Sequence, residues 1–115
     1  MGRSEHNLSW PDFQKVEMRV GTILKAEPFK QAKKPAIRLE IDFGAIGIKR
    51  SSAQITELYD SEKLIGKQVI AVLNFPPKQI ATVMSECLIL AAVDSEIGAS
   101  LLSLDHRIAN GTRIS

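Results

Sequence analysis

The segment 49–56, KRSSAQIT, places two adjacent serines directly after two cations. Small hydroxyl groups beside positive charge are compatible with a catalytic nucleophile, a phosphate-binding loop, a nucleic-acid contact or the cap of a helical turn. Each of these sites requires other residue types elsewhere in the chain. The rest of the sequence therefore separates the alternatives.

A hydrolytic site would need a histidine and an acid to activate one of the serines. The chain has two histidines, His6 and His106, and His106 follows Asp105, so a Ser/His/Asp triad can be written on paper. No Gly-x-Ser-x-Gly turn surrounds the serines, however, and neither common glycine-rich nucleotide loop is present. No group of metal-ligating residues has suitable spacing either. We therefore expect a protein that is not an enzyme and that has no metal or other cofactor.

Positive charge is concentrated in one part of the chain. The net charge is +2, but segment 30–50 alone carries six cations and two acids, a net +4, which leaves −2 for the remainder. Such a segment favours an anionic partner, and a solvated charged face is the alternative.

Length and composition indicate one small globular domain. The chain has 115 residues, of which 44% are hydrophobic, and we expect one domain over 1–115 with a flexible tail at 1–8. The single cysteine, Cys87, lies in the apolar run CLILAAV and is predicted to be buried, which fits a reducing compartment. No apolar stretch reaches about 18 residues and the N-terminus lacks the apolar core of an export signal. We therefore expect no membrane span and a cytoplasmic location.

Hydrophobic patterning predicts five core strands. Alternation or continuous apolar character marks segments 16–24, 37–43, 46–50, 68–73 and 87–93, and Gly21 suggests a bulge in the first of them. Ser9 and Pro11 predict the start of a short helix, and segment 51–66 has weak helical character. Segment 74–86 is expected to be a long connection, segment 101–104 an edge strand, and Asn110-Gly111 a turn.

This order of elements favours an all-β fold. Antiparallel hairpins, a bent first strand and a helical segment between the third and fourth strands are typical of a five-stranded barrel of the oligonucleotide/oligosaccharide-binding (OB) type. Short helices and terminal extensions complete the prediction. An open β-sandwich is the alternative.

Six sequence blocks carry a more specific signal. EMRVGTILKAE, IRLEIDFG, IKRSSAQIT, LIGKQVIAVLNFPPKQI, MSECLILAA and NGTRIS occur in this order. Together they resemble the CsaA family, described as export-related chaperones, which is similar in turn to the tRNA-binding domains appended to methionyl-tRNA synthetases. The resemblance covers about 12–115. It implies an OB fold, a homodimer, and binding of either tRNA or unfolded and preprotein polypeptides.

One segment separates the two branches of this superfamily. Appended tRNA-binding domains often carry a His-Pro-x-Ala-Asp-like segment after the first strand, whereas this chain has EPFKQAKKPA at 27–36. The difference favours a free-standing CsaA-like protein, an ATP-independent chaperone in protein export. The alternative is a tRNA-binding module that recognises RNA shape and backbone through a basic face.

The resemblance places a set of RNA-binding candidates on the exposed barrel face. Cations would contact phosphates, while hydroxyl and amide groups would contact phosphate, sugar or base edges. The structural alternative is that Ser52 caps the following turn and that Asn74 ends a strand. Phe29 and Phe75 are the nearby aromatic residues that could stack on bases. The candidates are Lys49, Arg50, Ser51, Ser52, Gln54, Asn74, Lys78 and Ser85.

Apolar residues supply the other candidate sites. A peptide groove near the connection after the fourth strand would use Phe75, Pro76, Ile80 and Met84, although packing in the core is the ordinary role of such residues. Surrounding cations would favour clients with acidic or neutral flanks. Apolar residues in the terminal segments are candidates for a dimer interface, because a single barrel does not need them. These are Leu8, Trp10, Leu101, Leu102, Leu104 and Ile108.

Overall fold

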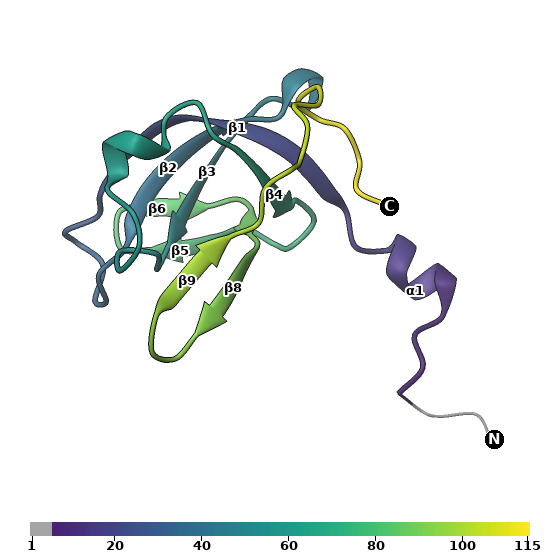
Figure 1. Ribbon diagram of the computed structural model, residues 1–115, viewed down its shortest axis with the longest axis horizontal. Helices are drawn as coiled ribbons and strands as arrows, with labels where there is room; N and C mark the ends of the chain where they lie inside the picture. The colour runs from purple at the N-terminus through teal and green to yellow at the C-terminus, as the bar shows by residue number, and fades with distance from the viewer. Residues whose placement is uncertain (1–5) are drawn as a thin grey trace.

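The computed structural model describes residues 6–115 and shows a mostly β fold (Figure 1). Residues 1–5 of the predicted tail lie outside the described residues. The strands are β1 (Met18–Pro28), β2 (Ile37–Asp42), β3 (Ile48–Ala53), β4 (Gln68–Val72), β5 (Lys78–Ile80), β6 (Val83–Ser85), β7 (Leu88–Ile89), β8 (Ala91–Asp94) and β9 (Gly98–Leu101). The helix α1 (Trp10–Gln14) and the 3-10 turns η1 (Gly44–Ile46) and η2 (Ser61–Leu64) complete the list.

Five strands form a nearly closed barrel. The sheet order is β3-β2-β1-β4-β7, and each neighbouring pair is antiparallel. At the seam the Glu86 N–H donates to the Arg50 carbonyl at 2.8 Å, which joins the segment before β7 to β3. The predicted OB-like barrel is confirmed, and the open sandwich is not observed. No helix within residues 6–115 has the length and apolar character needed to cross a membrane.

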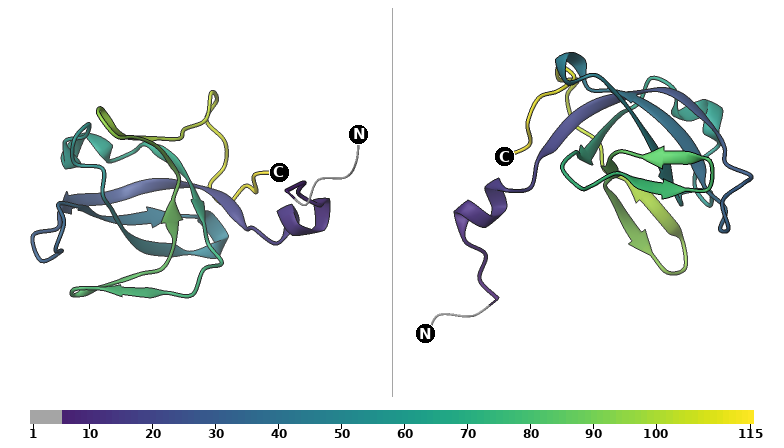
Figure 2. Two further views of the ribbon diagram at one scale, coloured as in Figure 1. Left: turned by 90° about the horizontal axis from the view of Figure 1, so that it is seen from below. Right: turned by 180° about the vertical axis from the view of Figure 1, so that it is seen from behind.

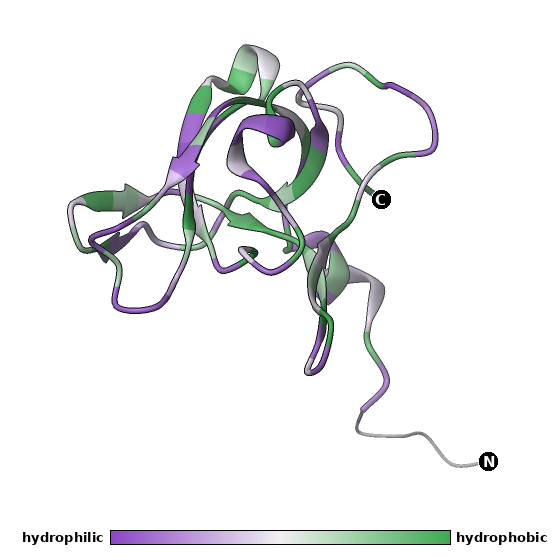
Figure 3. Ribbon diagram, turned by 60° about the vertical axis from the view of Figure 1, so that its left-hand side comes forward, coloured by the Kyte–Doolittle hydropathy of each residue, from purple (hydrophilic) through white to green (hydrophobic). Residues whose placement is uncertain are grey.

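Alternating side chains fill the barrel as the pattern predicts. In β2, Ile37, Leu39 and Ile41 are buried between half-exposed polar residues, and Phe43 follows them into the same core. In Figure 3 the ribbon changes repeatedly between hydrophobic and hydrophilic colours along the barrel strands, as expected for a sheet with one buried face. Burial of these side chains is the main contribution to stability.

The bulge in β1 lies at Leu24, not at Gly21. The register against β2 shifts between Ile23 and Lys25, whereas Gly21 pairs regularly with Val69. A Cβ atom at Gly21 would lie 2.6 Å from the Ile41 Cγ2 atom, so the core leaves no room for a side chain there. Gly21 therefore permits close packing, and the bulge turns Leu24 outward after the buried Ile23.

Local patterning mispredicted three other segments. Ser51 and Ser52 extend β3 and pair with β2, so within 51–66 helical turns occur only at η2. The expected connection 74–86 contains the antiparallel hairpin β5–β6. The predicted last core strand is divided into β7 and β8, and β9 ends at Leu101 rather than forming a strand over 101–104. Strands of two or three residues are too short to show a clear period of two.

Both ends of the described chain lie beside the start of β1. The predicted helix is confirmed, because the Ser9 Oγ atom accepts the Asp12 N–H at 3.2 Å. No residue of α1 is buried, and Figures 1 and 2 show the helix projecting from the barrel. The predicted turn at 110–111 brings the C-terminal segment onto β1, where the Gly111 N–H donates to the Val20 carbonyl at 2.7 Å.

Candidate ligand-binding face

The β5–β6 hairpin covers one part of the barrel wall near β3. Lys78 pairs with Ser85 and Ile80 pairs with Val83, so these four side chains share the face of the hairpin turned toward the barrel. Val83 is buried there in a small cluster with Phe29 and Ala36, against which Ile80 packs. The hairpin is therefore anchored at one end and leaves space beneath the other.

An apolar groove of 350 Å³ opens beside this hairpin. Two large apolar side chains at the groove are strongly exposed, Phe75 at 56% and Leu88 at 50%. Charge at the groove comes from Lys78 and Glu86. The lining residues are Ser52, Phe75, Pro76, Lys78, Ile80, Ser85, Glu86, Cys87 and Leu88.

A second cavity, the basic hollow of 590 Å³, adjoins the apolar groove. The two share Ser52, Lys78 and Ile80, which places an apolar and a positively charged surface side by side. Lys33 and Lys34 reach this hollow from the loop between β1 and β2. The lining residues are Gln31, Ala32, Lys33, Lys34, Ala36, Ser52, Gln54, Lys78, Gln79, Ile80 and Ala81.

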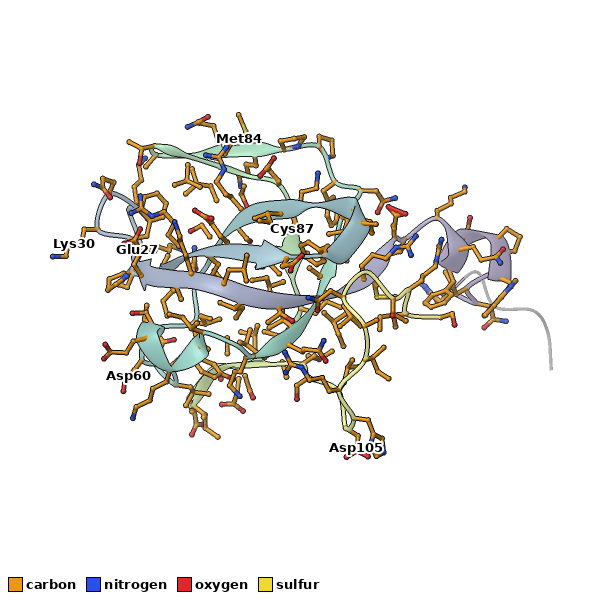
Figure 4. The ribbon with its side chains drawn as sticks, turned by 90° about the horizontal axis from the view of Figure 1, so that it is seen from above. Glu27, Lys30, Asp60, Met84, Cys87 and Asp105 are labelled. Atoms are coloured by element: carbon orange, nitrogen blue, oxygen red, sulfur yellow. The ribbon has the colours of Figure 1, made fainter. Side chains whose placement is uncertain are left out.

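The predicted peptide residues meet at the apolar groove, with one exception. Phe75, Pro76 and Ile80 line it, but Met84 does not. Met84 alternates with the inward-facing Val83 and Ser85 of β6, so its side chain points to the outer face of the hairpin, where Figure 4 places it. Met84 therefore lies outside the apolar groove. Leu88, which the sequence interpretation missed, takes its place.

Four predicted RNA-binding residues line the two cavities. Ser52 and Lys78 contribute to both, Gln54 lies at the basic hollow, and Ser85 lies at the apolar groove. Ser51 is 1% exposed, and its hydroxyl donates to the Cys87 carbonyl at 2.9 Å across the barrel seam. Ser51 is therefore a structural residue that faces the core, not the surface.

Lys49 and Arg50 do not act as a pair. Successive residues of β3 point to opposite faces, and Arg50 lies 3.6 Å from Glu86 between the Nε and Oε1 atoms. The Arg50 charge is therefore partly compensated by a carboxylate. Lys33 and Lys34, which the sequence interpretation counted only in the charge of segment 30–50, carry the positive charge at the basic hollow. Their place in the polar KQAKK run was the available signal.

The two aromatic candidates for base stacking differ in their exposure to solvent. Phe29 is 3% exposed and packs under the hairpin, so it cannot stack on a base. Phe75 is exposed at the rim of the apolar groove. Stacking through this face would therefore depend on Phe75.

Asn74 has a structural role at the base of α1. Its Oδ1 atom accepts the Glu17 N–H at 3.0 Å, and its Nδ2 group donates to the Lys15 carbonyl at 2.6 Å. Both ends of the amide hold the segment between α1 and β1. Asn74 also lies outside both cavities.

Asn74→Ala should loosen the N-terminal segment without weakening ligand binding. Loss of both hydrogen bonds should speed amide exchange at Glu17, whose N–H loses its acceptor, and cost about 1–3 kcal/mol of stability. Hydrogen exchange and urea unfolding measure these effects. Asn74→Asp keeps the acceptor for the Glu17 N–H and should lose less stability than Asn74→Ala. A fall in tRNA affinity with unchanged exchange would contradict the structural role.

Cys87 lies between the apolar groove and the core. It is 6% exposed, as predicted, and burial raises the pKa of its thiol to about 11. The neutral thiol is therefore a weak nucleophile at physiological pH. Residues 6–115 contain no group of three His, Cys, Asp or Glu side chains arranged to hold a metal ion.

The predicted dimer residues occupy different environments. Leu8 and Trp10 are 68% and 63% exposed on the projecting N-terminal segment, and the Trp10 and Phe13 ring centroids are 5.5 Å apart. Leu102 and Ile108 are also exposed, and Leu104 is half-buried. Leu101 packs against the barrel core, so its burial requires no second chain.

A model of the family described as "Putative tRNA binding domain" matches residues 18–113. Two solved structures share this fold over nearly their whole length. A chaperone CsaA from Bacillus anthracis is 50% identical, with a TM-score of 0.89, and the match covers 95% of this chain and 99% of that chain. The CsaA chaperone protein from Picrophilus torridus is 47% identical, with a TM-score of 0.87 and coverage of 95% and 100%.

The chain belongs to the CsaA-like tRNA-binding-domain family. The same domain occurs within much longer proteins. A methionine–tRNA ligase from Methanococcoides burtonii is 36% identical over 107 residues, which is 93% of this chain and 16% of that ligase. This chain therefore corresponds to a small part of the ligase.

Proposed function

We propose that the protein is an ATP-independent chaperone that holds unfolded or preprotein polypeptides in the cytoplasm during protein export. The apolar groove carries this proposal, because it leaves Phe75 and Leu88 exposed beside the lysines of the adjoining basic hollow, which suit acidic or neutral clients. The likeness to two structures described as CsaA chaperones supports it. Holding a client requires binding alone, without catalysis.

An aggregation assay tests this role. A chemically denatured client diluted into buffer without nucleotide should scatter less light when stoichiometric amounts of the protein are present. Binding should be loose, because ordering an extended client costs conformational entropy at every residue. Undiminished aggregation, together with no binding of a labelled unfolded peptide, would defeat the proposal.

Binding of tRNA is the second candidate function. The family supports it, and so does the basic hollow, where Lys33, Lys34 and Lys78 meet around one cavity. Since the hollow and the apolar groove share Ser52 and Lys78, the two ligands should compete for one face. Added tRNA should therefore displace a bound labelled peptide, whereas independent binding would indicate two separate sites.

A homodimer formed through the terminal segments completes the proposal. Leu8 and Trp10 lie on the projecting N-terminal segment and remain largely exposed to solvent within residues 6–115. A second chain that packed on this segment would cover them. Light scattering should give about twice 12.7 kDa at micromolar concentration. Trp10→Glu should yield a monomer, while Val93→Glu, at a still more exposed site on β8, should not. A monomeric wild-type protein would refute the dimer.

A further inference from the structure

The hydrogen-bond pattern of β3 determines which of its backbone groups face outward. The Phe43 N–H donates to the Gly47 carbonyl at 2.9 Å, next to the first pair of the β2–β3 ladder. In an antiparallel ladder hydrogen-bonded pairs alternate with non-bonded pairs. Lys49, Ser51 and Ala53 are therefore the β3 residues that bond to β2. Between them, the backbone groups of Arg50 and Ser52 point away from β2, toward the barrel seam.

These two residues differ in whether their outward groups are used. The Arg50 carbonyl accepts the Glu86 N–H at 2.8 Å, and the Arg50 N–H donates to the Glu86 Oε1 atom at 2.9 Å. Over residues 6–115, no comparable bond reaches the Ser52 N–H or carbonyl. Ser52 also lines both the apolar groove and the basic hollow. The edge of β3 is thus closed at Arg50 and open at Ser52.

We propose that the open edge of β3 at Ser52 pairs with an extended client segment, which adds one short strand beneath the β5–β6 hairpin. The proposal rests on the proposed chaperone function and specifies how the client is held. Backbone hydrogen bonds to Ser52 would supply affinity that does not depend on client sequence. Side chains on alternate client residues would enter the apolar groove beside Phe75 and Leu88.

Charge at the site indicates which client segments fit. Lys33, Lys34 and Lys78 surround the basic hollow, whereas the one acid of the apolar groove, Glu86, already accepts the Arg50 N–H. The occupant is therefore an extended segment with alternating apolar residues and an acidic residue at the end that lies over the lysines. A polypeptide has the alternating N–H and carbonyl groups that a strand edge pairs with, and an RNA backbone does not.

The hairpin also explains why an open edge is tolerated. Exposed strand edges promote pairing between folded molecules, and proteins commonly cover them. Ile80 and Val83 hold the hairpin against the Phe29 cluster, so the edge at Ser52 lies within a cavity rather than on a flat surface. A single flexible strand can enter this space, whereas the edge of another folded sheet cannot.

A backbone-modification scan tests strand addition directly. The probe is a labelled seven-residue peptide with alternating leucine and serine and one terminal aspartate, and each amide is N-methylated in turn. Affinity, measured by fluorescence anisotropy, should fall about two- to tenfold at the one position whose N–H donates to the Ser52 carbonyl. Methylation at the other positions should change affinity little, because their N–H groups meet no open carbonyl on β3. Peptides with an ester at the same positions control for the added methyl group and should lose affinity at the same single position.

The outcomes separate this inference from the chaperone proposal. Tight binding of the parent peptide with equal or no effect at all positions would overturn strand addition and leave side-chain capture as the chaperone mechanism. Failure of the parent peptide to bind would overturn both. A loss at a single position that is also seen with saturating tRNA would support strand addition while contradicting the single shared face.

Discussion

Replacement of Lys33, Lys34 and Lys78 with alanine together should lower the affinity for tRNA at low salt by about tenfold or more. The three side chains converge on the basic hollow although Lys33 and Lys34 come from the β1–β2 loop and Lys78 from β5. Each phosphate contact contributes about 0.7–0.9 to the slope of log K against log salt. The triple variant should therefore flatten that slope by about two, which a salt titration measures.

A matched triple variant controls for the loss of net charge. Lys15→Ala, Lys63→Ala and Lys67→Ala remove the same charge from sites outside the two cavities; Lys15 and Lys63 each lie beside an aspartate. This control variant should keep nearly the wild-type slope of log K against log salt. If both variants reduce the slope equally, general electrostatic attraction explains tRNA binding and the hollow is not the site.

Lys49→Ala and Arg50→Ala should change the slope of log K against log salt less than replacement of the lysines of the basic hollow does. From sequence alone these two residues were the expected phosphate contacts. Strand geometry points them to opposite faces, and the Arg50 Nε atom lies 3.6 Å from the Glu86 Oε1 atom. A contact with a nearby carboxylate reduces the positive potential that a phosphate would experience.

The barrel strands were predictable because their signal is local. β2 alternates over six residues, and β4 is apolar on both faces, so residue order alone fixes their type. Phe75, Pro76 and Ile80 could be grouped from sequence because they are close in the chain, and all three line the apolar groove. The extension of β3 over Ser51 and Ser52 depends on pairing with β2, a tertiary contact that overrides weak local preference.

The composition of the site depended on contacts between distant residues. Lys33 and Lys78 are 45 positions apart in the chain, and only the hairpin β5–β6 brings them to one cavity. The roles of Asn74 and Ser51 likewise follow from hydrogen bonds to Glu17 and Cys87 across the fold. A polar residue type in a suitable motif does not distinguish a surface contact from such a structural bond.

Phe75→Asp should abolish suppression of client aggregation while leaving the barrel folded. Phe75 is the most exposed large apolar residue of the groove, so its replacement removes an aromatic anchor without opening the core. A carboxylate there would lose its hydration wherever a client's apolar side chain approaches. We expect peptide affinity to fall by at least about tenfold, as for the loss of an interface anchor. Anisotropy and the aggregation assay measure the two effects.

Met84→Asp provides the matched control, because it places the same charge on the same hairpin region but on the opposite face. Met84 is exposed and lines neither cavity, so this variant should hold clients as well as the wild type does. Equal losses in both variants would mean that clients bind the hairpin as a whole or that negative charge alone repels them. Loss confined to Phe75→Asp would locate client binding in the apolar groove. A modest fall in the tRNA affinity of Phe75→Asp would indicate that polypeptides bind the apolar part of the shared face and that RNA binds its lysines.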